Sequence, residues 1–152
     1  MKHLLSVLLV LTLFISCSPD NSTPIDYVVK NEKDISDFIT LNKLTAQKSE
    51  TGLHYVVTDP GTGAQPTATS NVTVVYKGTF LDGRIFDQST NAGITIGLNQ
   101  VIKGWTEGIP HFKEGGSGIL LIPAHLGYGN YNYSGIPGGS VLLFDIKLIS
   151  VN

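Results

Sequence analysis

The residues of this chain that could do chemistry are mainly aromatic. Five rings lie in separate segments of the sequence: Tyr76, Phe86, Trp105, Tyr128 and Phe144. Taken alone, such rings are more often simply parts of a hydrophobic core. If the fold gathered them around one space, they would form a dry pocket that acts by binding and by excluding water.

Other familiar kinds of site are disfavoured by the sequence. His54, His111 and His125 lack metal-ligand spacing and Cys17 is the single cysteine, so we expect no zinc site and no cofactor. The chain has no Gly-Lys-Ser/Thr element for phosphate and no Gly-x-Ser-x-Gly elbow for a nucleophilic serine. Its net charge is −2 without a basic cluster, which disfavours nucleic-acid binding.

Short strands are the elements that must position these rings. The chain has 152 residues with 17 glycines and 7 prolines, which suits one domain of strands and turns. Strand-like runs occupy residues 53–57, 72–76, 85–86, 94–96, 119–122 and 141–151. A short helix is predicted over residues 104–112, where Pro110 removes a backbone donor and shortens it. The pattern predicts an α+β domain over residues 49–152, with an antiparallel sheet wrapped around that helix.

A second helix is predicted in front of this domain. Apolar residues fall at helical spacing in the segment 32–48, and Asn31 or Asp34 could cap the helix. The helix could serve as an arm for dimerisation or client binding, or it could pack on its own domain. We favour packing on the domain.

The first residues have the features of an export signal. Lys2 precedes an apolar run over residues 4–15, which at about a dozen residues is shorter than the ~20 of a typical membrane span. The end of this run, Phe14-Ile15-Ser16-Cys17, resembles the lipobox of bacterial lipoproteins. The resemblance implies that the signal peptide, residues 1–16, is cut off and that Cys17 carries acyl chains. An ordinary signal peptide, with a cysteine that is buried or removed, is the alternative.

This interpretation fixes an expected location for the protein. Two or more acyl chains hold a protein stably on a membrane. We therefore expect a lipid-anchored protein of the bacterial cell envelope, in the outer membrane and facing the periplasm. Residues 17–31 would form a tether between the anchor and the helix.

Four motifs in order resemble the signature of the FK506-binding-type (FKBP-type) peptidyl-prolyl cis/trans isomerases. They are Tyr76-Lys77-Gly78 with residues 82–89 (DGRIFDQS), residues 101–108 (VIKGWTEG), Ile122-Pro123 with Tyr128-Gly129, and Ile136-Pro137 with residues 143–146 (LFDI). Each motif alone would be weak, but the ordered set is highly specific. The resemblance covers about residues 52–151 and implies a twisted sheet of five or six antiparallel strands around a short helix.

The resemblance also implies a pocket for a substrate proline. Trp105 would form its floor, and Asp87 and Tyr128 would supply polar groups at its rim. Ile136 would cover it, and the Ile102 backbone N–H would bind a substrate carbonyl. The walls would be formed by Tyr76, Phe86, Val101, Ile102 and Phe144.

The implied activity is isomerisation of X-Pro bonds in proline-containing client polypeptides. A non-catalytic chaperone or binding module with the same pocket is the alternative, because a fold alone does not decide a function. The segment between Phe86 and Val101 is shorter than in the best-known cytosolic members, and Ala92 falls roughly where those carry an aromatic residue. We therefore expect weak binding of the macrolide FK506.

Overall fold

The computed structural model describes residues 25–152, and the description below is confined to them. The expected signal peptide, the expected acylation of Cys17 and the first part of the tether lie outside the described residues. In the part that is described, no helix is both long and apolar enough to cross a membrane.

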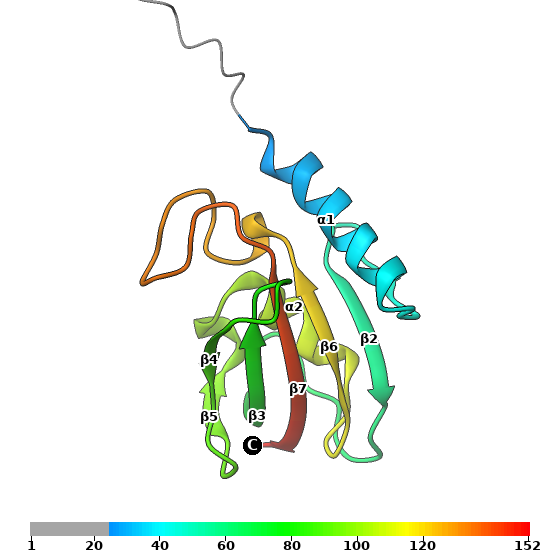
Figure 1. Cartoon of the computed structure of the whole chain (residues 1–152). Helices are drawn as coiled ribbons and strands as arrows, with labels where there is room; N and C mark the ends of the chain where they lie inside the picture. The colour runs from blue at the N-terminus through cyan, green and yellow to red at the C-terminus, as the bar shows by residue number, and fades with distance from the viewer. Residues whose placement is uncertain (1–24) are drawn as a thin grey trace, which may run out of the picture.

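One antiparallel sheet forms the body of the domain (Figure 1). Its strands are β1 (Gln47–Lys48), β2 (His54–Asp59), β3 (Asn71–Thr79), β4 (Ile85–Gln88), β5 (Ile94–Gly97), β6 (Ser117–Ile122) and β7 (Leu142–Val151). They run in the order β1-β2-β6-β7-β3-β4, and β5 also pairs with β3. The six predicted strands and the α+β class are confirmed. The seventh strand, β1, was not predicted, because two residues are too few to show a periodicity.

Alternation along the strands gives the sheet two different faces. In β7, Leu142, Phe144, Ile146 and Leu148 are buried in the main core, whereas Asp145 is exposed. Leu121 and Leu143 pair directly across β6 and β7 and belong to a second, smaller apolar cluster. Since successive side chains of a strand point to opposite faces, the two clusters lie on the two sides of the sheet.

The helix α2 (Lys103–Gly108) lies against the face that carries the main core. It approaches β6 closely, since a methyl group added at Gly104 would lie 2.5 Å from Ile122 and one at Gly108 would lie 2.6 Å from Leu120. This approach brings Trp105 into the core, where it is 5% exposed. The predicted helix over residues 104–112 is divided, and its second part is a 3-10 turn over Ile109–His111 that contains Pro110.

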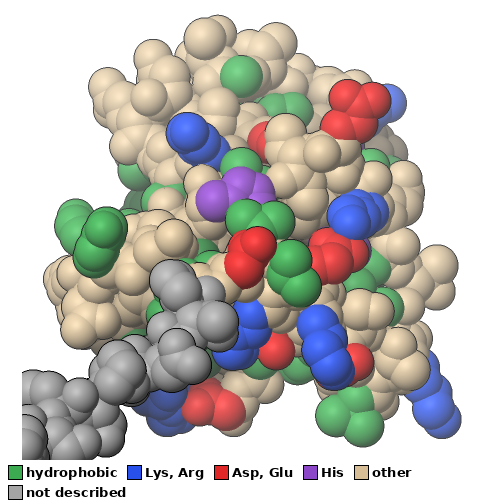
Figure 2. Space-filling view, turned by 90° about the horizontal axis from the view of Figure 1, so that it is seen from above, with side chains coloured by type: hydrophobic (Ala, Val, Ile, Leu, Met, Phe, Trp, Pro, Cys, Tyr) green, Lys and Arg blue, Asp and Glu red, His purple; other side chains and the backbone are tan. Residues whose placement is uncertain are grey.

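The helix α1 (Tyr27–Leu41) packs on the opposite face of the sheet (Figure 1). Ile35 is fully buried there against Leu121, Val141 and Leu143. The helix therefore packs on its own domain. Its outer side carries charged pairs such as Lys33 with Asp37, and basic, acidic and apolar side chains are interspersed on the surface seen from above in Figure 2.

The predicted bounds of this helix, residues 32–48, were wrong at both ends. The helix begins at Tyr27, because the Asp26 carboxylate caps it by accepting from the Val28 N–H at 2.9 Å. Residues 27–31 of the expected tether are thus helical, and neither Asn31 nor Asp34 is the cap. The helix ends at Leu41, because Lys43 takes the left-handed conformation, with φ at 53°.

Candidate active site

A cavity of about 420 Å³ opens between the start of α2 and the sheet. Six separate segments supply its lining: β3, β4, β5, the run from Gln100 into the first turn of α2, the loop after β6, and β7. The lining residues are Tyr76, Asp87, Ile96, Gln100, Val101, Ile102, Trp105, Tyr128, Tyr133 and Phe144. A cavity of this size, lined by aromatic and aliphatic side chains together with several polar groups, is typical of a site for a small group or side chain.

Trp105 is at the centre of the aromatic lining. The Tyr76 ring lies 4.9 Å from the Trp105 ring, and the Phe144 ring lies 5.2 Å from it, each at an interplanar angle of 81°. Edge-to-face contacts of this kind are favourable because the positive edge of one ring meets the negative face of another. The three rings therefore hold one another at fixed angles.

Two of the expected pocket residues do not border the cavity. Phe86, expected as a wall, packs edge-to-face on Phe144 with 5.4 Å between ring centroids, and its other neighbour is Phe80. Ile136, expected as a cover, is buried in the main core. Phe86 thus supports the Phe144 wall from behind, whereas Ile136 anchors the end of its loop.

The polar groups of the cavity include a short hydrogen bond. The Tyr76 hydroxyl donates to Asp87 Oδ2 at 2.6 Å. Burial, and then this bond, raise the pKa of Tyr76 far above its ordinary value. Burial also raises the pKa of Tyr128, with smaller contributions from Tyr133 and the Asp87 charge. Both phenols therefore stay protonated at neutral pH and keep their donor hydrogens.

The turn into α2 places a backbone donor at the cavity. The Ile102 carbonyl accepts from the Trp105 N–H at 2.9 Å and so begins the helix. Within the described residues, the Ile102 N–H donates to no backbone or side-chain acceptor. The same short turn thus positions both the indole floor and an N–H that a ligand can use.

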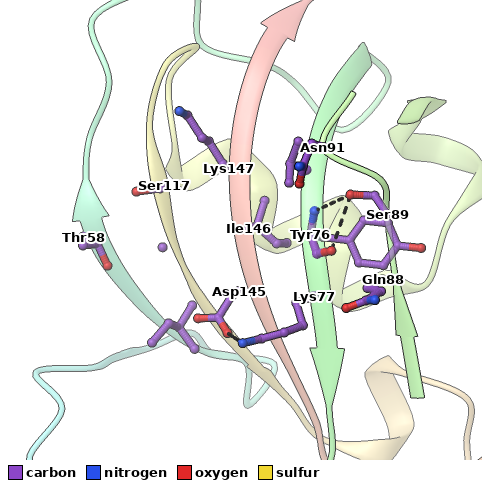
Figure 3. Close-up of a pocket in the computed structure, with 13 residues that line it drawn as sticks. Thr58, Tyr76, Lys77, Gln88, Ser89, Asn91, Ser117, Asp145, Ile146 and Lys147 are labelled. Atoms are coloured by element: carbon purple, nitrogen blue, oxygen red, sulfur yellow. Dashed lines mark hydrogen bonds and ion pairs between the residues drawn. The ribbon is translucent and has the colours of Figure 1, made fainter. Parts of the chain in front are cut away.

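The opposite face of the sheet has a larger but different concavity, of about 560 Å³ (Figure 3). It is an open groove whose lining includes one aromatic residue, Tyr76. Lys77 and Asp145 approach to 3.7 Å across it, and each side chain is 51% exposed. Exposed ion pairs of this kind contribute little free energy. The groove is solvated and lacks the aromatic lining of the cavity beside α2.

Comparison with known families agrees with the geometry of the cavity. Residues 62–149 match the family described as FKBP-type peptidyl-prolyl cis-trans isomerase. The chain belongs to this family. The predicted resemblance is confirmed, and the matched residues run from just after β2 to near the end of β7.

Several FKBP-type relatives are bacterial. The chain is 40% identical over 127 residues to FkpA of Aeromonas hydrophila, an alignment that covers 81% of this chain and 47% of the relative. It is 41% identical over 133 residues to FkpA of Escherichia coli K12, covering 80% of this chain and 49% of the relative. The chain thus spans about half the length of the curated relatives it matches.

Solved structures of related proteins share the fold. The crystal structure of FkpA from Escherichia coli matches with a TM-score of 0.71 and 38% identity, over 82% of this chain and 64% of that one. A peptidyl-prolyl cis-trans isomerase from Pseudomonas syringae pv. tomato matches with the same TM-score and 32% identity, over 82% of this chain and 96% of that one.

Sequence reasoning identified most of this FKBP-type cavity. Seven expected residues border it: Tyr76, Asp87, Val101, Ile102, Trp105, Tyr128 and Phe144. The pocket that the resemblance implied did not include Ile96, Gln100 or Tyr133, which also line the cavity. The first two lie close to the Val101 motif in sequence, and that proximity was the available signal. Tyr133 lies in a loop of unusual composition, where no motif marks it.

Proposed function

We propose that this chain catalyses cis/trans isomerisation of X-Pro peptide bonds in exported polypeptides. The observation that carries the proposal is the cavity floored by Trp105, with the Tyr76–Asp87 hydrogen bond at 2.6 Å beside the rings. Family membership supports the same activity.

The reaction needs no covalent step. Rotation about the X-Pro bond disrupts amide resonance, against a barrier of ~18–20 kcal/mol, and the uncatalysed exchange takes roughly tens to hundreds of seconds. The planar amide carries more charge separation than the twisted transition state. A dry aromatic cavity therefore disfavours the planar amide relative to the twisted one. Only such a difference in binding raises the rate, by tenfold for each ~1.4 kcal/mol.

The proposal assigns roles to seven residues that line the cavity and to Phe86 behind them. Trp105 lies beneath the proline ring, and the Ile102 N–H binds a substrate carbonyl. Asp87 and Tyr128 act by hydrogen bonding and by their electric field, which agrees with phenols that stay neutral. Phe86 acts as a positioning residue, through Phe144. The side walls are Tyr76, Val101, Ile102 and Phe144.

The test compares two aspartates on the two faces of one sheet. Asp87→Leu removes the acceptor of the Tyr76 hydroxyl, whereas Asp145→Leu removes a carboxylate on the outer groove. Catalysed exchange of a Leu-Pro peptide is measured by NMR on both folded variants. Because a hydrogen bond to a charged group contributes about 1.5–3 kcal/mol, Asp87→Leu is expected to lose at least roughly tenfold in kcat/KM. Asp145→Leu is expected to keep the native value.

The outcome also separates the two candidate functions. Equal losses in both variants would show that the cavity carboxylate has no special role. A well-folded native protein that binds the peptide without exchanging it would indicate the non-catalytic chaperone or binding module.

We propose in addition that Cys17 carries lipid and holds the domain in the bacterial cell envelope, at the outer membrane and facing the periplasm. Lys2, the apolar run over residues 4–15 and the lipobox-like residues before Cys17 support this proposal. Labelling of cells with an alkyne fatty acid is expected to mark the native protein. Cys17→Ala is expected to lose the label and to leave the outer-membrane fraction; a labelled variant would refute the assignment.

FK506 is expected to bind weakly, since Ala92 is exposed in the turn between β4 and β5 and offers no ring to the cavity. Nanomolar affinity in a calorimetric titration would refute this expectation.

A further inference from the structure

The loop between β6 and β7 ends in a defined hairpin. The Tyr133 N–H donates to the Ile136 carbonyl at 2.9 Å, and the Ile136 N–H donates back to Tyr133 at 2.8 Å. Ser134 and Gly135 between them have φ angles of 45° and 86°. Two successive left-handed residues are the mark of a tight two-residue hairpin turn. Asn132 ties the base of the turn by accepting from the Gly138 N–H at 2.9 Å. The position of Tyr133 is therefore set by the backbone.

This hairpin places one ring over the cavity mouth. The Tyr133 ring stacks on the Tyr128 ring, with 4.8 Å between centroids and an interplanar angle of 10°. Both rings line the same cavity as Trp105. Tyr133 nevertheless remains 56% exposed, so much of its ring surface has no partner in this structure. Tyr131, two residues earlier, is 87% exposed and does not border the cavity.

The stacked pair has a surface suited to another ring. Buried aromatic pairs gain free energy beyond the area that they bury, whereas an aliphatic side chain gains the area term alone. Asp87 lines the same mouth, and its charge contributes to the raised pKa of Tyr128. An acidic side chain at this position would therefore meet like-charge repulsion.

We infer that Tyr133 is a specificity-determining residue, which with Tyr128 forms a stacking surface for an aromatic side chain next to the substrate proline. The inference rests on the proposed isomerase function of the cavity. The expected order of substrates is an aromatic residue beside proline, then an aliphatic one, then an acidic one. The preference for aromatic over aliphatic residues comes from the ring of Tyr133 and does not need its hydroxyl.

The test compares the kcat/KM for a Phe-Pro peptide with that for a Leu-Pro peptide. A general loss of activity lowers both values and leaves their ratio unchanged. Exchange of Phe-Pro and Leu-Pro peptides, otherwise identical, is measured by NMR with the purified protein. The native protein is expected to have a kcat/KM roughly three- to tenfold higher for Phe-Pro. Tyr133→Leu, which keeps apolar bulk, is expected to bring the ratio to about one, whereas Tyr133→Phe keeps it. Tyr131→Leu is the matched control and is expected to keep the native ratio.

The outcomes separate this inference from the proposed function. If the native protein exchanges neither peptide, the isomerase proposal fails, and the same ratio is then measured as dissociation constants by chemical-shift titration. A native preference that disappears in Tyr133→Leu alone supports the stacking surface. A native protein without preference for Phe-Pro, or a ratio that Tyr133→Leu leaves unchanged, overturns it.

Discussion

The two faces of the sheet are made by the same strands yet have opposite properties. In β7, Phe144 points toward α2 and the aromatic cavity, whereas Asp145 next to it faces the open groove. The inner face gathers rings at edge-to-face distances, and the outer face combines the aliphatic contacts of α1 with a solvated groove. Alternation with a period of two thus lets one strand contribute to a binding site and to a structural cover.

A buried asparagine of α1 links the two faces. Asn31 of α1 is buried and donates from its amide to the Gly139 carbonyl at 2.9 Å. Its side-chain oxygen accepts from the Ala124 N–H at 2.8 Å. Ala124 and Gly139 flank the loop that carries Tyr128 and Tyr133. A helix on the outer face therefore fixes both ends of a loop that borders the inner cavity.

The largest expected effect is on stability and comes from the outer face. Ile35→Ala removes a fully buried side chain from the contact of α1 with the sheet. Truncations of this kind cost about 2–5 kcal/mol, which denaturant unfolding measures. The kcat/KM of the folded fraction is expected to stay native. Ser36→Ala, at an exposed neighbour, is the control. Loss of catalysis in folded Ile35→Ala would contradict the separation of the two faces.

The next largest effect is expected from a residue of α1 on the outer face, and it should lower both the stability of the protein and the activity of the inner cavity. Asn31→Ala leaves the Ala124 N–H and the Gly139 carbonyl without their partner, at a cost of about 1–3 kcal/mol. Because the flanks of the loop loosen, kcat/KM is expected to fall severalfold as well. Asn31→Asp separates the two bonds, since a carboxylate can accept from Ala124 but cannot donate to Gly139. Native kcat/KM in Asn31→Ala would mean that the loop keeps its shape without α1.

The sequence predicted the strands and the site residues that belong to a repeating pattern or to a motif. It did not predict the features that depend on a single contact in the folded chain. Alternating apolar residues predicted the strands, and ordered motifs predicted Trp105 and Asp87 at one site. The start of α1 was missed because its first turn has exposed valines and only the Asp26 cap marks it. Asn31 was expected at a cap, since nothing local shows that its partners lie 93 and 108 residues away.

Two site residues show the same limit. Phe86 belongs to the motif, yet its ring packs behind Phe144 and does not border the cavity. The prediction was wrong because a motif does not show which of two neighbouring rings faces the cavity. Tyr133 has no motif at all, and a two-residue turn with left-handed angles places it on Tyr128. Positions that depend on packing order or on turn geometry follow from the tertiary structure and not from residue spacing.

A smaller effect is expected within the cavity. Tyr76→Phe keeps the ring on Trp105 but removes the hydroxyl that donates to Asp87. The hydrogen bond to the charged Asp87 contributes about 1.5–3 kcal/mol, but the Asp87 carboxylate stays at the cavity in this variant. The kcat/KM is therefore expected to fall by less than in Asp87→Leu, roughly three- to tenfold. The free energy of unfolding is expected to change by less than in Ile35→Ala. A variant that is destabilised yet fully active would reverse the roles assigned to the two faces.

The smallest expected effect is a pH dependence on the side of α1. Burial lowers the pKa of His54, although the Glu32 carboxylate lies 3.8 Å from His54 Nε2 and opposes the shift. The unfolded chain therefore binds a proton at His54 more readily than the folded chain does. The contribution of His54 to stability is present above its unfolded pKa of about 6.5 and is lost as the pH falls through its lower folded pKa. Urea unfolding at pH values from 7.5 to 5 is expected to show this loss.

His54→Phe is expected to reduce the slope of stability against pH. The pKa of His111 is also lowered by burial, so part of the slope should remain and should disappear in the double variant with His111→Phe. Lys48, which pairs with Glu32 at 2.6 Å, also lowers the pKa of His54. Lys48→Met leaves Glu32 free to stabilise the imidazolium and so raises the folded pKa of His54 toward its unfolded value. The fall in stability is therefore expected to become smaller and to end at a higher pH. A slope that His54→Phe leaves unchanged would show that the acid sensitivity arises away from the contact between α1 and the sheet.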